Sequence, residues 1–484
     1  MKNYSLVFVL ILISCSKPKA IENDFDNWEK YNILWIVADD LGKDLGCFGN
    51  DLVNTPNLDK LASESILYNN LFTTAAVCSA SRSGLITGMY PVSIEAHQHR
   101  TRYKKRLPDS IKTLPYFFKK AGYFVTNGNA KFNAKKGKTD YNFHIDFNEL
   151  YQDLYWTSRA KNQKFFSQIQ IFYPHRPFYK DSVNPINPNN INLPPYYPDE
   201  ALIKKDWALY LETVQQVDIS VGNIIKKLEE ENLLDNTIIF FFGDQGRPHL
   251  RAKQFLYDGG INTPLMIRYP NGYKAGETSN KLISNIDIPV ATLNLAGIEV
   301  PKYIQGKNFL SDDFERDYVF AMRDRRDETV DRIRAVRTKK FKYIKNYYPN
   351  KAYTQYNTYK EMHYPALPLM HQLYKEGKLN HIQSQFMAKS RAEHELYDLE
   401  KDPFEIHNLA ENKTYQDTLS VLQKKLYNWV DKNDLGTYPE SEEEIKTAQK
   451  EANKRRKKIL NSRNLEEDAS HNDLIKFWNK KLLP

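Results

Sequence analysis

The sequence predicts an α/β fold in which helices enclose a sheet, followed by a smaller α+β subdomain. Over the first part of the chain, apolar runs of strand length alternate with helical stretches, which is the pattern of a doubly wound sheet. At 484 residues the chain exceeds one average domain. After about residue 312 the apolar runs become shorter and their connections more polar, so we expect the second unit there.

The first expected strand covers residues 33–38, a continuous apolar run followed directly by Asp39 and Asp40. Such runs are typical of strands that are buried on both faces. Ligands of open α/β sheets bind beyond the carboxyl ends of the strands, so the two acids mark the expected site. Further strands are expected at 123–126, 165–172, 237–242 and 264–268, and helices at 111–121 and 206–231.

The later part of the chain divides again by composition. Short strand-like pieces at 335–337, 341–344 and 396–399 indicate the α+β subdomain. The segment 441–463 is almost entirely charged, and we expect it to form a solvated helix or to be partly disordered. We therefore divide the chain into a signal segment at 1–15, a main domain at 28–311, a subdomain at 312–440 and a charged tail at 441–484.

The net charge is +9, from 69 basic and 60 acidic residues. Much of the excess lies in a basic run at 450–458. A charge run is usually a solvated face, so we expect no nucleic-acid partner. A group of arginines between residues 323 and 337 is interpreted as a second surface cluster. A basic pocket for an anionic substrate accounts for the charge equally well.

The first residues have the pattern of an export signal. Lys2 precedes an apolar stretch at 6–13, which is too short to span a bilayer, and Ser14 and Cys15 follow it. This arrangement resembles the lipobox of bacterial lipoproteins, in which Cys15 is lipidated and becomes the mature N-terminus. The alternative is an ordinary secretory signal cleaved near Ala20. We expect an exported protein of the periplasm or cell surface, held to a membrane by its lipid anchor.

The sharpest local signal is the segment 77–88, in which small and hydroxylated residues follow Cys78 and an apolar helix then begins. The thiol is expected at a helix start, where backbone N–H groups and the helix dipole favour an anion. Arg82 lies four residues further on and therefore on the same helical face. The alternative for Cys78 is a buried, inert cysteine.

Two pairs of polar residues follow two of the expected strands. Asp39 and Asp40 end one strand, and Asp244 and Gln245 end another after an all-apolar run. Both pairs are expected at the same edge of the sheet. Three carboxylates and an amide oxygen are hard ligands, so a Ca²⁺ site is favoured over a zinc site. The alternative is that each acid caps a helix after its strand.

Together these segments resemble the type I sulfatases. The signature is Cys78-Ser79-Ala80-Ser81-Arg82 with Leu85-Ile86-Thr87-Gly88, and it continues in the family's order at 32–40, 242–246, 251–260 and 396–403. The resemblance implies an alkaline-phosphatase-like mixed sheet flanked by helices, with the catalytic domain at 28–311. It also implies that Cys78 is oxidised after translation to formylglycine, which joins the four oxygen ligands in holding one divalent cation. Ala80 stands where many members have proline, which implies maturation by a radical-type enzyme.

The resemblance assigns cationic side chains to the sulfate and its leaving group: Arg82, Lys253, His175 and one lysine that follows Gly122. Lys138 fits the form seen in a polysaccharide-acting branch of the family, whereas Lys131 has the more usual distance from Gly122. We prefer Lys138.

One histidine of the family pattern is missing from this sequence. Many sulfatases carry it two residues after the catalytic lysine, where this chain has Asp140 or, counted from the other lysine, Asn133. The base that releases the product is therefore not assigned by the resemblance.

His97, His99 and Arg100 follow the helix of the nucleophile in a segment dense with cationic side chains. Such a segment suits an acidic saccharide, and the same branch has a similar histidine-rich stretch there. We expect these three residues to bind the sugar and to take no part in the chemistry. The alternative is an exposed basic loop.

The expected function is hydrolysis of sulfate esters in sulfated polysaccharides or oligosaccharides. Algal polymers such as ulvan are favoured and glycosaminoglycans come second, because of the branch resemblance. Two alternatives stay open. One is a phosphodiesterase or phosphonate monoester hydrolase of the same superfamily, and the other is a non-catalytic glycan-binding protein.

Overall fold

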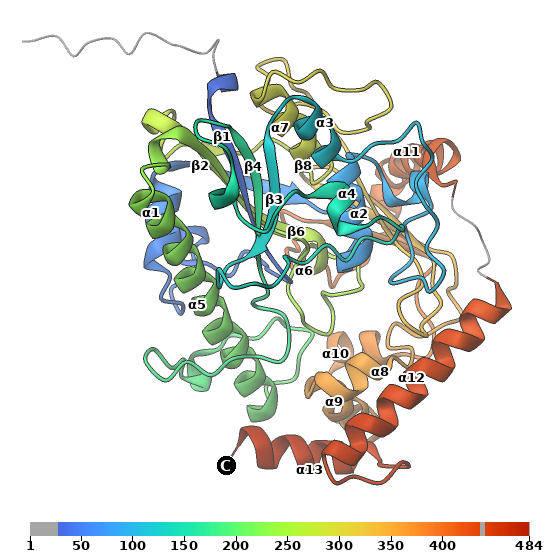
Figure 1. Ribbon diagram of the computed structural model, residues 1–484. Coiled ribbons are helices and arrows are strands. Elements are labelled where there is room, and N and C mark those ends of the chain that lie inside the picture. The colour runs from blue at the N-terminus through green and yellow to red at the C-terminus, as the bar shows by residue number, and fades with distance from the viewer. Residues whose placement is uncertain (1–27, 436–440, 484) are drawn as a thin grey trace, which may run out of the picture.

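The computed structural model describes residues 28–435 and 441–483 (Figure 1). The predicted signal segment at 1–15, with the lipidation site at Cys15, lies outside these residues. None of the helices in the described part of the chain is long and apolar enough to cross a membrane.

The main sheet has the strand order β3-β4-β1-β5-β6-β2-β7, and β8 pairs with β2. Its strands are β1 (Asn32–Ala38), β2 (Ser65–Phe72), β3 (Phe124–Asn129), β4 (Phe165–Ile171), β5 (Thr237–Gly243), β6 (Asn262–Arg268), β7 (Thr278–Ser279) and β8 (Ile283–Ser284). The five strands expected from the sequence are all present. Strands β3, β4, β1 and β5 are parallel, whereas β6 runs antiparallel to β5 and to β2. The sheet is therefore mixed, as the family resemblance implies, and β6 is its antiparallel strand.

Both faces of the sheet are buried, which explains why its central strands β1 and β5 are apolar along most of their length. Leu34 and Ile36 of β1 face one core, into which α1 (Pro56–Ser63) and α5 (Ala201–Glu230) pack. Trp35 faces the other core and donates a 3.1 Å hydrogen bond to Thr292 of α7. Further helices are α2 (Cys78–Thr87), α3 (Leu114–Lys120), α4 (Phe147–Leu150), α6 (Asp258–Ile261) and α7 (Asp287–Leu295).

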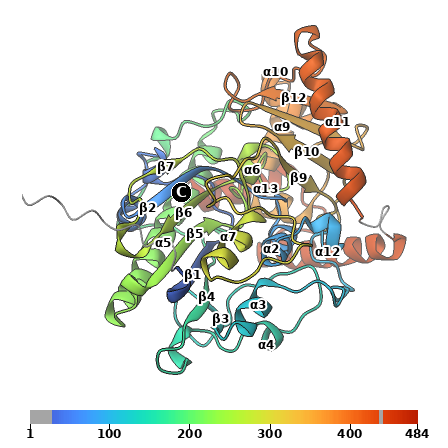
Figure 2. The ribbon, with the colours of Figure 1, turned by 90° about the horizontal axis from the view of Figure 1, so that it is seen from above.

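The predicted α+β subdomain is built on a second, antiparallel sheet of order β12-β11-β10-β9. Its strands are β9 (Val319–Arg323), β10 (Ile333–Arg337), β11 (Phe341–Asn346) and β12 (His394–Asp398), and α11 (Gln416–Asn433) packs on it (Figure 2). Trp429 of α11 stacks on Phe320 of β9 with ring centroids 5.1 Å apart. The fold class expected from the sequence is thus confirmed.

The arginines between residues 323 and 337 do not form the expected surface cluster. Arg334 is fully buried and lies 3.0 Å from Asp324. Arg337 lies 2.9 Å from Asp258 of α6, which belongs to the main domain. The surface interpretation was wrong because these arginines are buried against acids that pair with them. The pair of Arg337 with Asp258 joins the second sheet to the main domain, whereas Arg334 and Asp324 both belong to the subdomain.

The charged tail forms α12 (Glu442–Ser462) and α13 (His471–Leu482), so the helical alternative was right for this segment. The neighbouring subdomain helices are α8 (Thr358–His363), α9 (Ala366–Lys375) and α10 (His381–Met387) (Figure 1). Helix α12 packs on α8, and α13 packs on α9 and on α5 of the main domain. Leu460 and Leu474 are buried against Met362 of α8. The few apolar residues of the tail therefore pack it against the subdomain.

Candidate active site

Cys78 is the first residue of α2 and is almost fully buried, as the sequence motif indicates. All ten residues of α2 are buried. Most of its side chains are small, which allows the helix to be enclosed on all sides. Its hydroxyl groups are satisfied inside the helix: Ser83 donates to the carbonyl of Ser79 at 2.6 Å. Burial raises the pKa of the Cys78 thiol, although Lys138 and Lys253 act to lower it. An unmodified Cys78 is therefore a neutral and weak nucleophile.

Arg82 lies beside Cys78 and is held by two polar contacts. Its Nε lies 2.7 Å from Oδ2 of Asp244, and its Nη1 donates to Oε1 of Gln170 at 2.7 Å. Gln170, near the end of β4, was not predicted from the sequence. The signal was present, because Gln168 and Gln170 are polar residues in a strand that is buried throughout. Nη2 of Arg82 has no hydrogen-bond partner in the described part of the chain, so it is available to an anion.

The four predicted metal ligands meet at the carboxyl ends of β1 and β5, which are paired and parallel. The backbone N–H of Asp40 donates to Oδ1 of Asp244 at 2.9 Å. The donor atoms of Asp39, Asp40 and Cys78 lie within 4.8 Å of one another. Burial raises the pKa of Asp244 to about 7, with Asp39 and Asp40 adding to the effect of burial and Arg82 opposing it.

A divalent cation fits this set of donors. Among the described residues, Oδ1 of Asp39 and Oε1 of Gln245 are buried without a hydrogen-bond partner. The Gln245 amide donates instead to Asp40, and an exchange of its oxygen and nitrogen would turn the oxygen toward the carboxylates. Buried, crowded carboxylate oxygens are costly unless a positive charge compensates them. The oxygen-rich donor set suits Ca²⁺.

Two lysines flank the aspartates. Lys138 Nζ lies 2.6 Å from Oδ2 of Asp39, and Lys253 Nζ lies 2.7 and 2.6 Å from the two oxygens of Asp40. Burial lowers the pKa of Lys138, but Asp39 more than offsets this, and the pKa ends above its usual range. Lys131 is exposed. The geometry therefore favours Lys138 over Lys131 as the lysine of the site.

His175 completes this side of the site, with Nε2 3.9 Å from Oδ2 of Asp40. Burial, followed by the charge of Lys253, lowers the pKa of its imidazole. The hydroxyl of Tyr359, from α8 of the subdomain, lies 3.5 Å from the same nitrogen. Lys253 lies over the ring of Tyr359, 5.7 Å from its centroid. No sequence motif marks Tyr359, which is one of several tyrosines between residues 353 and 364.

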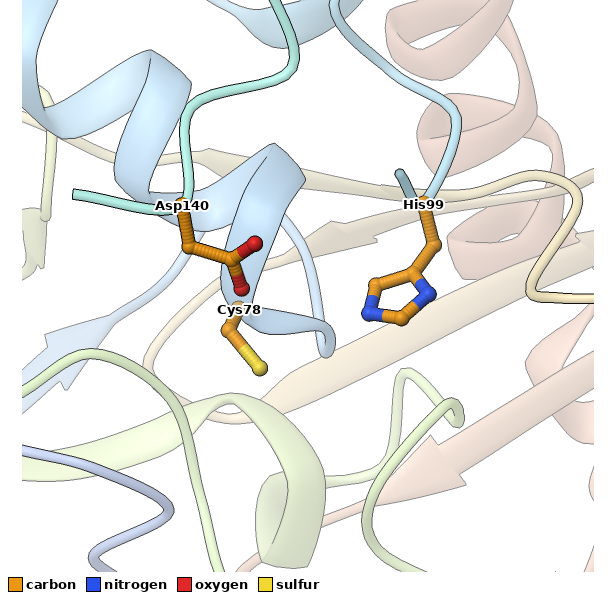
Figure 3. A group of neighbouring side chains, drawn as sticks. All are labelled: Cys78, His99 and Asp140. Carbon is orange, nitrogen blue, oxygen red and sulfur yellow. The ribbon is translucent and has the colours of Figure 1, made fainter. Parts of the chain in front are cut away.

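His99 lies at Cys78, although the sequence placed it with the residues that bind the sugar. A ring nitrogen of His99, the Cys78 sulfur and a carboxylate oxygen of Asp140 all lie within 4.8 Å of one another. Figure 3 shows the three side chains pointing into one space. Nδ1 of His99 lies 3.5 Å from Oδ1 of Asp327, and no partner for Nε2 is found in the described residues. Burial lowers the pKa of His99 to about 4, so its ring is neutral near pH 7.

Arg100 and His97 have different surroundings. Nε and Nη2 of Arg100 make a bidentate contact with Asp140 at 3.0 and 2.9 Å, and half of the side chain stays exposed. His97 is buried near Asp324 and Arg334, and burial lowers the pKa of its ring. These surroundings favour a structural role for His97, and a place in the substrate cavity for Arg100.

A cavity of about 750 Å³ opens beside the aspartates. Its lining includes Asp39, Lys138, His175 and Arg100, together with Phe172 and Tyr179, which are 49% and 45% exposed. Arg100 also lines a second cavity, of about 240 Å³, whose other wall is α12 of the tail. The two cavities therefore meet at Arg100.

Comparison with known proteins agrees with this geometry. The family model "Sulfatase" matches residues 31–298, and the model "N-sulphoglucosamine sulphohydrolase, C-terminal" matches residues 246–393. An ulvan-active sulfatase of Formosa agariphila is 36% identical over 91% of this chain and 83% of its own length. Human N-acetylgalactosamine-6-sulfatase is 29% identical over 58% of this chain and 65% of its own length.

Solved structures share the fold at lower identity. A protein in complex with its substrate D-glucosamine-2-N,6-O-disulfate matches with a TM-score of 0.59 and 20% identity over 83% of this chain and 98% of its own. A phosphonate monoester hydrolase from Silicibacter pomeroyi matches with a TM-score of 0.61 and 17% identity over 83% of this chain and 96% of its own. The family model spans more than half of the chain, and the site at the carboxyl ends of β1 and β5 lies within it. The chain belongs to the sulfatase family and is a sulfatase.

Proposed function

We propose that this sulfatase removes sulfate esters from a sulfated polysaccharide, with ulvan favoured and glycosaminoglycans second. The observation that carries the proposal is the position of Cys78 at the start of α2, its donor atom within 4.8 Å of those of Asp39 and Asp40. The ulvan preference is supported by the relative that spans 91% of the chain. The glycosaminoglycan alternative is supported by the more distant N-acetylgalactosamine-6-sulfatase.

The cavity supports a sugar polymer as substrate. Its volume of about 750 Å³ can hold sugar units, and its lining includes the cationic side chains of Arg100 and Lys138. Phe172 and Tyr179 offer exposed aromatic faces at its rim, of the kind that binding pockets use for ring-shaped ligands. Arg100 stands at the junction with the smaller cavity, where it can reach an anionic group on a neighbouring sugar.

We propose that residue 78 acts as formylglycine, made by a radical-type maturase. When hydrated, formylglycine supplies a hydroxyl nucleophile for sulfur and a covalent sulfate intermediate. Arg82 places a positive charge beside residue 78. Its Nε and Nη1 contact protein groups, so Nη2 is the nitrogen that can donate to the sulfate. Lys138 and Lys253 place two further positive charges on the sulfate side of the site.

We propose that Asp39, Asp40, Asp244 and Gln245 hold one Ca²⁺ together with residue 78. The cation would supply Lewis-acid polarisation of the nucleophile and of the sulfate oxygens. The four side chains would hold the cation. Two of them also form ion pairs with lysines, Asp39 with Lys138 and Asp40 with Lys253.

Two groups are placed to move protons. We propose that His175 or Lys253 protonates the departing sugar oxygen, because both lie beside Asp40 at the cavity. We also propose that His99, whose ring nitrogen lies within 4.8 Å of the Cys78 sulfur, takes the role of the histidine that is missing from the family pattern. A neutral ring, a nitrogen near residue 78 and a carboxylate at 3.5 Å from Nδ1 are the attributes of an oriented general base. We therefore move His99 from sugar binding to proton transfer, and keep Arg100 as a sugar-binding residue.

We further propose that the protein is exported and anchored through a lipid on Cys15, in the periplasm or at the cell surface. The support is the apolar stretch at residues 6–13 followed by Ser14 and Cys15.

The experiment is an activity screen of the full chain matured by co-expression with a radical-type maturase. Sulfate release is measured from oligosaccharides of ulvan, chondroitin sulfate and heparin, and phenyl phosphonate monoesters are tested in parallel. We expect sulfate release from ulvan oligosaccharides and none from the Cys78→Ala control. Preferential hydrolysis of the phosphonate esters, or activity retained in Cys78→Ala, would overturn the proposal.

A further inference from the structure

Two consecutive helices of the subdomain meet a helix of the charged tail that lies far from them in the sequence. They are α8, α9 and α13 (Figure 1). Each contributes one side chain that can bind a metal: Glu361 from α8, His371 from α9 and His471 from α13. One ligand atom from each of the three lies within 4.8 Å of the other two. This cluster is separate from the donors beside Cys78.

The Glu361 carboxylate is the unusual member of the cluster. Its side chain is only 6% exposed, and its recorded partners in the described part of the chain are the two imidazoles. Nε2 of His471 lies 3.4 Å from one carboxylate oxygen, and Nε2 of His371 lies 4.0 Å from the other. A carboxylate that has left water needs a positive charge or hydrogen-bond donors close to it. These contacts are long for hydrogen bonds, so an ion between the three side chains would bring a closer positive charge to the carboxylate.

The two histidines bring ring nitrogens close to the Glu361 carboxylate, with Nε2 of each ring within 4.0 Å of a carboxylate oxygen. An imidazole binds a metal through the lone pair of its neutral form. Two imidazole nitrogens with one carboxylate oxygen are preferred by Zn²⁺ and its first-row neighbours, whereas Ca²⁺ prefers oxygen alone.

We propose that Glu361, His371 and His471 bind one Zn²⁺-type transition-metal ion, which fastens the C-terminal tail to the subdomain. A water molecule would take the fourth position. Metal–nitrogen bonds of about 2.0–2.1 Å put tetrahedral ligand atoms about 3.3 Å apart. The three ligand atoms lie within 4.8 Å of one another, so each distance must close by about 1.5 Å at most. The two rings are now nearly parallel, at 8°, with centroids 4.7 Å apart, so one ring must also turn about its Cβ–Cγ bond. His471 is 41% exposed and has room for this rotation.

The ion would stabilise more than α13. The preceding helix of the tail, α12, forms a wall of the 240 Å³ cavity, where Arg455 lies 3.7 Å from Asp327 and Glu451 lies 3.5 Å from Arg102. These pairs are half-exposed and individually weak. A metal at the far end of the tail fixes α13 and thereby limits the fraying of α12 beside the cavity. Metal binding is thus linked to the order of the tail.

The test uses the full chain, stripped of metals and returned to a buffer with excess Ca²⁺, so that the oxygen site beside Cys78 is occupied. Zn²⁺ is titrated by calorimetry. We expect about one equivalent to bind, with binding lost in His371→Ala and His471→Ala and weakened at least tenfold in Glu361→Gln. His381→Ala, which removes an exposed histidine of the same subdomain, is the matched control and should bind as the unchanged chain does.

Two readouts keep the result independent of any folding defect in a variant. In the unchanged chain, Zn²⁺ should raise the melting temperature by a few degrees and slow amide exchange in residues 471–482, without the same effect in His471→Ala. Anomalous scattering at the zinc edge from crystals of the unchanged chain should place the ion between α8, α9 and α13. Zinc found only beside Cys78, or equal zinc binding by the unchanged chain and His471→Ala, would overturn the proposal. Neither result depends on whether the protein hydrolyses sulfate esters.

Discussion

Removal of the Lys138 amine tests the arrangement of the sulfate-binding charges. Lys138 Nζ lies 2.6 Å from Asp39, lines the 750 Å³ cavity and is only 11% exposed, so its charge acts in a region from which most water is excluded. Loss of one such preorganised electrostatic group costs about 2.7–4 kcal/mol of transition-state stabilisation. We therefore expect Lys138→Ala to lower kcat by about 10²–10³-fold, measured as sulfate release by the matured enzyme.

Lys131→Ala is the matched control for this experiment. Lys131 is exposed and lies in the same loop region, so its removal should change kcat less than twofold. Melting temperatures of both variants must be measured, because Lys138→Ala also breaks an ion pair of a buried carboxylate. A large loss of kcat in Lys131→Ala with little change in Lys138→Ala would refute the reasoning and assign the role to Lys131.

Three further predictions concern the base, the cation and the joint between the domains. His99→Ala should lower kcat by about 10²-fold or more on both an ulvan oligosaccharide and a small aryl sulfate. Arg100→Ala should impair only the oligosaccharide, and if His99→Ala does the same, His99 returns to sugar binding. Asp244→Asn should abolish calorimetric Ca²⁺ binding beside residue 78, and unchanged affinity would remove Asp244 from the ligand set. Lys342→Met should cost about 3–5 kcal/mol in denaturant unfolding, because fully buried Lys342 bridges Asp258 and Glu405, and a cost below about 1 kcal/mol would contradict this.

The sheet and the carboxylates of the proposed cation site were accessible from the sequence for one physical reason. The buried parallel strands β1 and β5 are apolar along most of their length, so the polar residues directly after them mark both the end of each strand and the site edge. Asp39 and Asp244 follow this rule, and β1 and β5 are neighbours in the structure. Strand β2 escaped prediction because Asn69 and Asn70 interrupt its apolar run at a register shift.

The rest of the site comes from loops and from the subdomain, where no periodicity operates. His99 and Asp140 lie in loops and meet at Cys78 only after the chain has folded. Tyr359 reaches His175 from α8, across the boundary between the domains. The buried arginines were misjudged for the same reason, since a partner such as Asp258 is distant in the sequence. Spacing along the chain cannot reveal such contacts.

The central claim is that residue 78 performs the hydrolysis as formylglycine. Its most direct test is peptide mass spectrometry of residue 78 in preparations that are co-expressed with graded amounts of the maturase, each assayed for sulfate release. We predict that specific activity rises in proportion to the fraction of residue 78 found as the aldehyde, and that it reaches zero when only the thiol is present. Full activity in a preparation whose residue 78 is entirely cysteine would contradict the account.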